Sequence, residues 1–359
     1  MKNDVMPVTL TRRRLLRAAL SGLTGLVALS CPVRAVPDCQ DDVAIDGATA
    51  LLFPVQAPLT PAPSRRDARA VWARVPPHPA TSVLLFLHGY NNYVTVDVQG
   101  RSRIPDWAAD DPAARAGALS KPAAPLVYGL DRLNSARTGK SLVVLVPEDG
   151  ALARRSFWAT TPRGQYADPA RLGALIAAAF AHLACLRRPD GLPYLSLSGP
   201  DMVGLERVYL CGHSGAGLPL QEAAGSDLVL PRAGVPTDLW LFDCTYWGNV
   251  TNFVEFCARW HGAGRLGAGR RNAARFVCVY RPHTQTEAVA DILRGQIAQA
   301  LGVSAATLVR DHITGDTGDN FAAEIRPALL TRGVLFLRTS LPHDDIPTYF
   351  IPRLLETAM

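Results

Sequence analysis

Short runs of consecutive apolar residues recur along the chain, separated by polar segments rich in glycine, proline and aspartate. Runs this short, with turn residues at both ends, are typical of strands that are buried on both faces of a parallel sheet. The segments of this kind are 83–87, 142–146, 208–211, 239–242, 276–280 and 334–338. Residues 69–75 (RAVWARV) instead alternate, which predicts an antiparallel strand near the start of the sheet.

Helices are predicted between these strands. Asp168 and Pro169 form a helix start, after which apolar residues at helical spacing share one face, namely Leu172, Leu175, Ile176, Ala179, Phe180 and Leu183. Thr284 and Glu287 form a Thr-x-x-Glu capping box that predicts a helix as far as about residue 301. A chain of 359 residues with 48% hydrophobic content can bury a sizeable core. The pattern therefore predicts one α/β domain with a central, mostly parallel sheet flanked by helices.

The apolar run at 208–211 leads into an unusual group of small residues around Ser214, because residues 208–217 read VYLCGHSGAG. A nucleophilic serine sits on a strained turn between a strand and a helix, where only small neighbours let the backbone bend and a carbonyl approach. Gly212, Gly215 and Ala216 meet that requirement. The pattern predicts a nucleophile at Ser214, and the alternative is a serine that caps the following helix.

Two other segments carry residues that suit the same chemistry. His88 and Gly89 directly follow the run 83–87, and His343 follows the last apolar run after a few residues. This order of His-Gly, Gly-x-Ser-x-Ala and a late His resembles the α/β-hydrolase superfamily over nearly the whole chain beyond its first 35 residues. The resemblance implies an α/β-hydrolase fold with loop insertions over the active site, and a triad in the order Ser, acid, His.

The acid of such a triad must lie between Ser214 and His343 in the sequence. Asp243 is the predicted acid because it stands at the C-terminal end of the strand 239–242, and catalytic groups gather at that edge of an open α/β sheet. The more usual place in the family is one strand later, where the only nearby carboxylate is Glu287, which belongs to the capping box. The remaining alternatives are Asp311, Asp316 and Asp319, whose Gly-rich setting is typical of turns.

In the triad template, Ser214 attacks an acyl carbonyl, His343 transfers the proton and Asp243 orients the imidazole. Backbone N–H groups of Gly215 and Tyr90 would form the oxyanion hole. The segments 91–122 and 154–165 look like insertions beside the site, so aromatic residues near that edge are predicted to line a substrate pocket, or else to pack in the core. These residues are Trp158, Tyr246 and Trp247, together with Trp107 and Phe157. Arg154 and Arg155 are interpreted as a solvated charge pair, with an anionic substrate group as the alternative partner.

Three further histidines have simpler interpretations. His88 is expected to position its loop through a hydrogen bond, whereas His213 and His283 are expected to be packed or solvated side chains. No CxxC spacing indicates zinc, and neither a metal nor a cofactor is expected.

The positive charge of the chain is concentrated at its N-terminus. Of the formal net charge of +6, the first 35 residues contribute +5, because Lys2, Arg12, Arg13, Arg14, Arg17 and Arg34 face only Asp4. The remaining +1 gives no support to nucleic-acid binding. Residues 11–17 (TRRRLLR) resemble the twin-arginine export motif, and an apolar region too short for a confident membrane span follows at 18–30. Residues 1–35 are thus predicted to be a signal peptide, and 36–359 the exported hydrolase domain.

The resemblance to twin-arginine substrates implies folding in the cytoplasm, transport by the twin-arginine machinery, and work in the periplasm or outside the cell. Lipid anchoring at Cys31 and a cytosolic protein with a basic amphipathic N-terminal helix are the alternatives. Without Cys31, six cysteines remain, which is compatible with disulfides, although Cys211 in a central strand is better interpreted as a buried thiol.

Taken together, these features predict an exported serine hydrolase that cleaves an ester, of a small or polymeric acyl substrate, through an acyl-enzyme. An amidase or peptidase of the same fold and an inactive binding protein are the alternatives, because a fold shared by many chemistries does not identify a substrate.

Overall fold

The computed structural model describes residues 43–44, 50–55, 69–76, 80–89, 128–130, 133, 141–147, 179–184, 187, 191, 205–226, 235–246, 250–267, 273–312 and 321–357. The chain divides into the units Met1–Pro37 and Asp38–Met359, and every described residue lies in the second unit.

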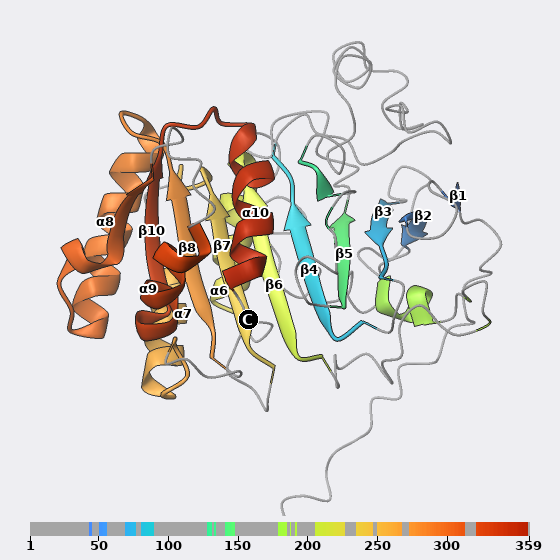
Figure 1. Ribbon diagram of the computed structural model, residues 1–359, viewed down its shortest axis with the longest axis horizontal. Coiled ribbons are helices and arrows are strands. Elements are labelled where there is room, and N and C mark those ends of the chain that lie inside the picture. The colour runs from blue at the N-terminus through green and yellow to red at the C-terminus, as the bar shows by residue number, and fades with distance from the viewer. Residues whose placement is uncertain are drawn as a thin grey trace, which may run out of the picture. The chain divides into compact units, whose positions relative to one another are not determined.

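The strands of the described residues form one sheet of ten strands, in the order β1-β2-β3-β5-β4-β6-β7-β8-β10-β9 (Figure 1). Their bounds are β1 Val43–Ala44, β2 Ala50–Val55, β3 Arg69–Arg74, β4 Ser82–Leu87, β5 Leu142–Pro147, β6 Arg207–His213, β7 Thr237–Phe242, β8 Arg275–Tyr280, β9 Val309–His312 and β10 Val334–Thr339. The first three strands pair antiparallel, and β3 pairs antiparallel with β5. All the pairs from β5 to β9 across the sheet are parallel.

The helices follow the later strands. Their bounds are α6 Gly217–Ala224, α7 Thr251–Gly262, α8 Gln285–Leu301, α9 Phe321–Arg332 and α10 Asp345–Thr357, with short 3₁₀ segments η6 at Ser214–Ala216 and η8 at Ala305–Leu308. The predicted capping box is confirmed, because α8 begins after Thr284, whose side chain accepts a hydrogen bond from the N–H of Glu287. Of the helix predicted from Pro169, only 179–184 is described, and these residues are helical.

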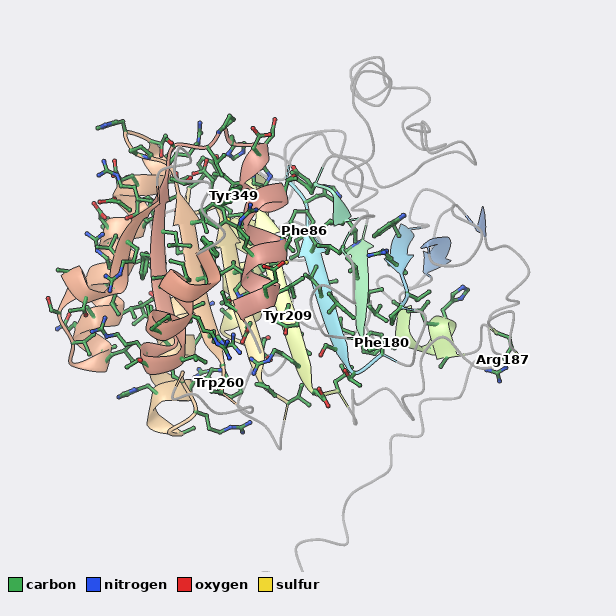
Figure 2. The ribbon with its side chains drawn as sticks, in the orientation of Figure 1. Phe86, Phe180, Arg187, Tyr209, Trp260 and Tyr349 are labelled. Carbon is green, nitrogen blue, oxygen red and sulfur yellow. The ribbon has the colours of Figure 1, made fainter. Side chains whose placement is uncertain are left out.

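Alternate residues of the central strands enter two separate apolar cores, one on each face of the sheet. Val83, Leu85 and Leu87 of β4 join the core formed with α6, α7 and α8, which contains Trp260. Leu84 and Phe86 join the opposite core formed with α9 and α10 (Figures 1 and 2). Because both faces are covered, the strands need the continuous apolar runs seen in the sequence rather than an alternating pattern.

The seven strands predicted from sequence are all present, and the predicted α/β fold class, with a central, mostly parallel sheet flanked by helices, is confirmed. Strands β1, β2 and β9 were not predicted, and each lies toward an edge of the sheet. β1 (VA) and β9 (VRDH) are short and carry little apolar pattern, whereas β2 (ALLFPV) is an apolar run that contains Pro54, a residue that argues against a central strand. The two predicted insertions, 91–122 and 154–165, lie outside the described residues, so the prediction of loops over the site stays a prediction.

The end of the sheet opposite the candidate site carries buried charge. Asp238 lies within β7 and is fully buried. Its Oδ1 accepts a hydrogen bond from Nη1 of Arg207 at 2.6 Å, and its Oδ2 lies 3.9 Å from Nε of Arg275. These arginines begin the neighbouring strands β6 and β8, so the ion pairs join three adjacent strand starts. Breaking a buried pair of this kind leaves an uncompensated charge and is strongly destabilising.

Candidate active site

The turn after β6 holds Ser214 in a conformation that few side chains adopt. Ser214 has a φ of +53°, in the left-handed region that an L-residue enters at a steric cost. The turn continues directly into α6, which begins at Gly217. A Cβ at Gly212 would lie 2.6 Å from Cβ of Ala216, and one at Gly217 would lie 1.8 Å from the carbonyl oxygen of Cys244. The small residues are therefore needed for the close approach of turn, helix and neighbouring strand.

The segment after β4 borders Ser214. A Cβ at Gly89 would lie 2.7 Å from Cβ of Ser214 and 3.2 Å from its Oγ, so the Gly89 backbone passes directly beside the serine. His88 is buried, and its Nδ1 lies 2.8 Å from the carbonyl oxygen of Gly89, in agreement with the expected positioning role. Burial lowers the pKa of His88. Tyr90, the predicted second oxyanion donor, lies outside the described residues.

Asp243 and His343 meet at the same edge of the sheet. The strand register pairs His213 with Phe242, so Ser214 and Asp243 each stand one residue beyond a paired position on adjacent strands. Asp243 is fully buried, and its Oδ2 lies 2.7 Å from Nδ1 of His343, which is partly exposed. The structure thus brings together an acid and a histidine that are 100 residues apart in the sequence.

The alternative acids have other contacts or are not described. Asp311 is exposed, and its Oδ1 lies 3.9 Å from Nη1 of Arg338. The same arginine places its Nε 3.0 Å from Oε1 of Glu287. Asp316 and Asp319 lie outside the described residues.

Three donors surround the carboxylate of Asp243. Oδ2 accepts from Nδ1–H of His343 and also from Nε–H of Arg281, whose Nε lies 2.6 Å away. Oδ1 accepts from the hydroxyl of Thr286. Burial by itself raises the pKa of Asp243, but the hydrogen bonds from His343, Thr286 and Arg281 outweigh it and lower the pKa to about 2. The carboxylate is therefore ionised at neutral pH. An ionised acceptor at Nδ1 keeps the proton on that nitrogen and leaves Nε2 of a neutral His343 able to accept one.

The start of α8 also holds the residues after Asp243. The Gln285 side chain donates through Nε2 to the carbonyl oxygen of Tyr246 at 2.8 Å, and the Thr245 hydroxyl donates to the carbonyl oxygen of Thr286 at 3.0 Å. Tyr246 is partly buried, and a side-chain hydrogen bond joins its hydroxyl to Ser214. Burial, assisted by the Asp243 charge, raises the pKa of Tyr246 to about 12, so the hydroxyl keeps its proton. Tyr246, predicted as a pocket wall, thus lies against the serine itself, while Trp158 and Trp247 lie outside the described residues.

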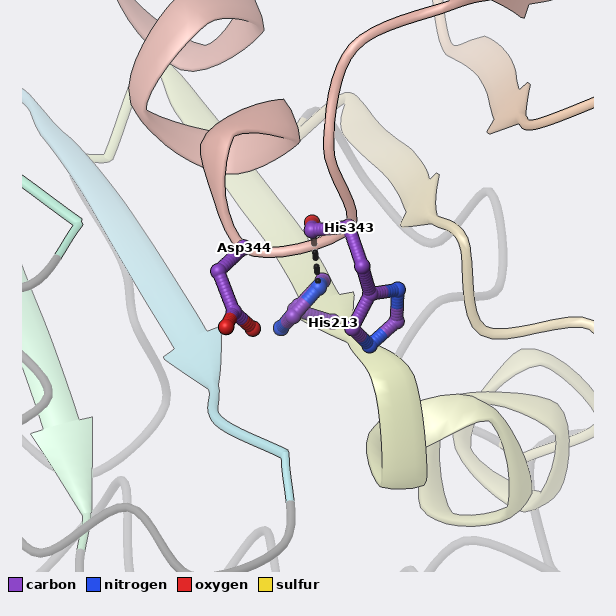
Figure 3. Close-up of side chains that lie close together, drawn as sticks. All are labelled: His213, His343 and Asp344. Atoms are coloured by element: carbon purple, nitrogen blue, oxygen red, sulfur yellow. Dashed lines mark hydrogen bonds between the residues drawn. The ribbon is translucent and has the colours of Figure 1, made fainter.

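His213, beside the serine, is buried and contacts the histidine loop. Its Nδ1 lies 2.9 Å from the hydroxyl of Tyr128. Its Nε2 lies 3.0 Å from the carbonyl oxygen of His343, as Figure 3 shows. Among the described residues, His213, His343 and Asp344 offer potential metal-ligand atoms within 4.8 Å of one another. Both nitrogens of His213 and Nδ1 of His343 already have hydrogen-bond partners, so this donor set fits a hydrogen-bonded site better than a metal centre.

Sequence reasoning missed three contributors to the site. Arg281 directly follows β8 and Thr286 lies in the first turn of α8, so the rule that functional groups gather at this edge of the sheet is the signal that points to them. Tyr128 has no comparable signal, because nothing in its local sequence relates it to His213, which it reaches only through the tertiary fold.

The structure describes four of the seven cysteines. Cys211, Cys244, Cys257 and Cys278 are buried free thiols, which confirms the interpretation of Cys211 and shows no disulfide among these four. Cys31, Cys39 and Cys185 lie outside the described residues. Within the described part of the chain, every helix is too short or too polar to cross a membrane.

No protein-family model matches the sequence, and no curated protein matches it. Among solved structures, the chain is similar to dienelactone hydrolase from Anabaena variabilis ATCC 29413, at 12% identity over 87% of this chain and 96% of that one, with a TM-score of 0.39. It is similar to carboxyl esterase 2 from Tuber melanosporum, at 12% identity over 96% of this chain and 97% of that one, with a TM-score of 0.37. It is also similar to the siderophore hydrolase EstB from Aspergillus nidulans, at 12% identity over 88% of this chain and 95% of that one, with a TM-score of 0.41. Likeness at this level assigns no activity to the chain.

Proposed function

We propose that the protein is a serine hydrolase that cleaves an ester bond through an acyl-enzyme, with Ser214 as nucleophile, His343 as general base and acid, and Asp243 as the orienting acid. The observation that carries the proposal is the 2.7 Å contact between Nδ1 of His343 and the buried, ionised Asp243 at the strand edge where Ser214 stands on its left-handed turn. Each part of this arrangement has a separate chemical use.

In the proposed reaction, Oγ of Ser214 attacks the acyl carbonyl while its proton passes to Nε2 of His343. The bond to the leaving group then breaks, and His343 returns the proton to the departing oxygen. Water repeats the sequence on the acyl-enzyme and releases the acid. Asp243 holds the Nδ1–H tautomer and stabilises the imidazolium that forms between the two proton transfers.

The charge that develops on the carbonyl oxygen needs hydrogen-bond donors beside Ser214. The N–H of Gly215 is the first proposed donor and the N–H of Tyr90 is the second, a choice supported by the close approach of the Gly89 backbone to Ser214. The Tyr246 hydroxyl, which already bonds to Ser214, reaches the same region.

A fluorophosphonate probe, which traps an activated serine covalently, tests the proposal. Wild-type protein should be labelled at Ser214, the Ser214→Ala variant should not be labelled, and Asp243→Asn should be labelled about ten-thousandfold more slowly. A panel of nitrophenyl esters and the matching anilides then separates an esterase from an amidase. Folded wild-type protein that resists the probe and hydrolyses neither series would refute the hydrolase proposal in favour of a binding role.

We further propose export by the twin-arginine route, on the sequence of residues 11–17. The buried free thiols at Cys211, Cys244, Cys257 and Cys278 are compatible with a fold completed in a reducing compartment before transport. Cell fractionation tests it: the wild-type protein should be found in the periplasm or medium, and a double Arg12→Lys, Arg13→Lys variant should remain in the cytoplasm. Equal export of both proteins would exclude this route.

A further inference from the structure

His213 makes two hydrogen bonds that fix its tautomer. Its Nε2 faces the carbonyl oxygen of His343, which can only accept, so Nε2 carries the proton. Its Nδ1 is then an acceptor, and the hydroxyl of Tyr128 donates to it. The chain of donors therefore runs in one direction, from Tyr128 through His213 to the backbone of His343.

The surroundings keep this imidazole neutral. His213 is 1% exposed, and burial, together with the nearby His343 ring, lowers its pKa to about 3. A charged His213 would carry protons on both nitrogens, and Nδ1 would lose its ability to accept from Tyr128. The donor chain is thus intact throughout the pH range in which a histidine base operates.

The chain of hydrogen bonds anchors the loop between β10 and α10. Tyr128 is buried and packs against Phe86 of β4, with the ring centroids 5.0 Å apart. The rings of His213 and His343 lie 4.2 Å apart between centroids. His343 is therefore held at two points, at its ring by Asp243 and at its backbone by His213. Figure 3 shows the second of these contacts. The second point connects the loop to the rigid centre of the sheet.

We propose that Tyr128 and His213 are positioning residues that hold the backbone of His343 so that its Nε2 meets the hydroxyl of Ser214. The inference rests on the proposed serine hydrolase function. A reacting group displaced by about 1 Å can lose roughly a hundredfold in rate even when substrate binding is intact. The expected effect of removing the chain is therefore on kcat and on the acylation rate rather than on KM.

Three substitutions separate hydrogen bonding from packing. His213→Phe keeps an aromatic ring but removes both hydrogen bonds, His213→Gln keeps an N–H that can reach the His343 carbonyl, and Tyr128→Phe removes only the hydroxyl. The rate of labelling by a fluorophosphonate probe should fall at least tenfold in His213→Phe, with about threefold or smaller losses in His213→Gln and in Tyr128→Phe. With p-nitrophenyl acetate, kcat should fall while KM changes less than about twofold.

The outcomes distinguish this inference from the proposed function. The positioning role alone is overturned if wild-type protein labels at Ser214 and a folded His213→Phe variant labels equally fast. It is also overturned if the labelling rate falls as much in His213→Gln as in His213→Phe. Wild-type protein that does not label overturns both proposals. Nitrogen-15 NMR of the histidine rings at pH 7 gives a check independent of activity, because a proton found on Nδ1 of His213 contradicts the donor chain.

Discussion

The buried, neutral His213 predicts a specific loss of stability in mild acid. Its pKa falls from an ordinary value of 6.5 to about 3 on folding, because burial penalises the charged form. The unfolded chain therefore binds a proton at His213 that the folded chain does not bind. The stability that the neutral His213 contributes is fully present above pH 6.5 and is lost as the pH falls toward 3. Each unit by which the pH falls in that interval lowers the free energy of unfolding by about 1.4 kcal/mol.

The magnitude between pH 7.5 and pH 4.5 follows from the same values. This one residue should remove about 2.5 kcal/mol of the free energy of unfolding of the wild-type protein over that interval. Any folded-state value well below 4.5 gives nearly the same result, because only the unfolded chain takes up the proton there. The groups around His213 are Tyr128, His343, Asp344, Asp243 and Arg281, and all remain in a His213→Gln variant.

Urea unfolding at pH 7.5, 6.0 and 4.5, followed by tryptophan fluorescence, measures the effect. His213→Gln should be less stable than wild type at pH 7.5, since a buried hydrogen-bonded group is altered. The difference should shrink by about 2.5 kcal/mol at pH 4.5, because the variant has no proton to take up at this position. His261→Gln makes the same exchange at an exposed position and serves as the control. Parallel pH profiles for wild type and His213→Gln would refute a neutral buried imidazole.

Three further predictions concern the close packing at Gly217, the Tyr246 hydroxyl and the buried thiols. Gly217→Ala should lower the free energy of unfolding by about 3 kcal/mol or more, because its Cβ would lie 1.8 Å from the Cys244 carbonyl oxygen. Gly295→Ala is the matched control in the same urea titration. It has open space around its Cβ and should raise the free energy of unfolding by up to about 1 kcal/mol. Tyr246→Phe, which loses the hydrogen bond to Ser214, should slow fluorophosphonate labelling about fivefold to tenfold at an unchanged melting temperature, and an unchanged rate would remove Tyr246 from the site. Iodoacetamide should leave the four buried thiols unmodified until urea unfolds the protein, because burial raises the pKa of each thiol. Peptide mass spectrometry detects the modification. Disulfide-linked peptides from these positions would contradict the structure.

The sequence alone determined the central strands and the turn that presents Ser214. Strands covered on both faces need unbroken apolar runs, and this local requirement is visible in β4, β6 and β10. The close contacts at Gly212 and Gly217 are likewise visible in the sequence as small residues, since no larger residue fits there. The choice of Asp243 over the other acids rested on its place at a strand end, and the fold sets its carboxylate against His343.

Only the tertiary structure decided what surrounds these residues. Arg281 and Thr286 meet Asp243 because β7 and β8 pair in parallel and end at the same edge, and Tyr128 reaches His213 across 85 residues of sequence. His213 was expected to be only packed or solvated, yet its two nitrogens connect the sheet to the His343 loop. Hydrogen bonds between segments distant in sequence depend on side-chain direction and on the register of the strands. Neither quantity is encoded in local residue pattern, so the partners of the triad residues emerge only when the chain is folded.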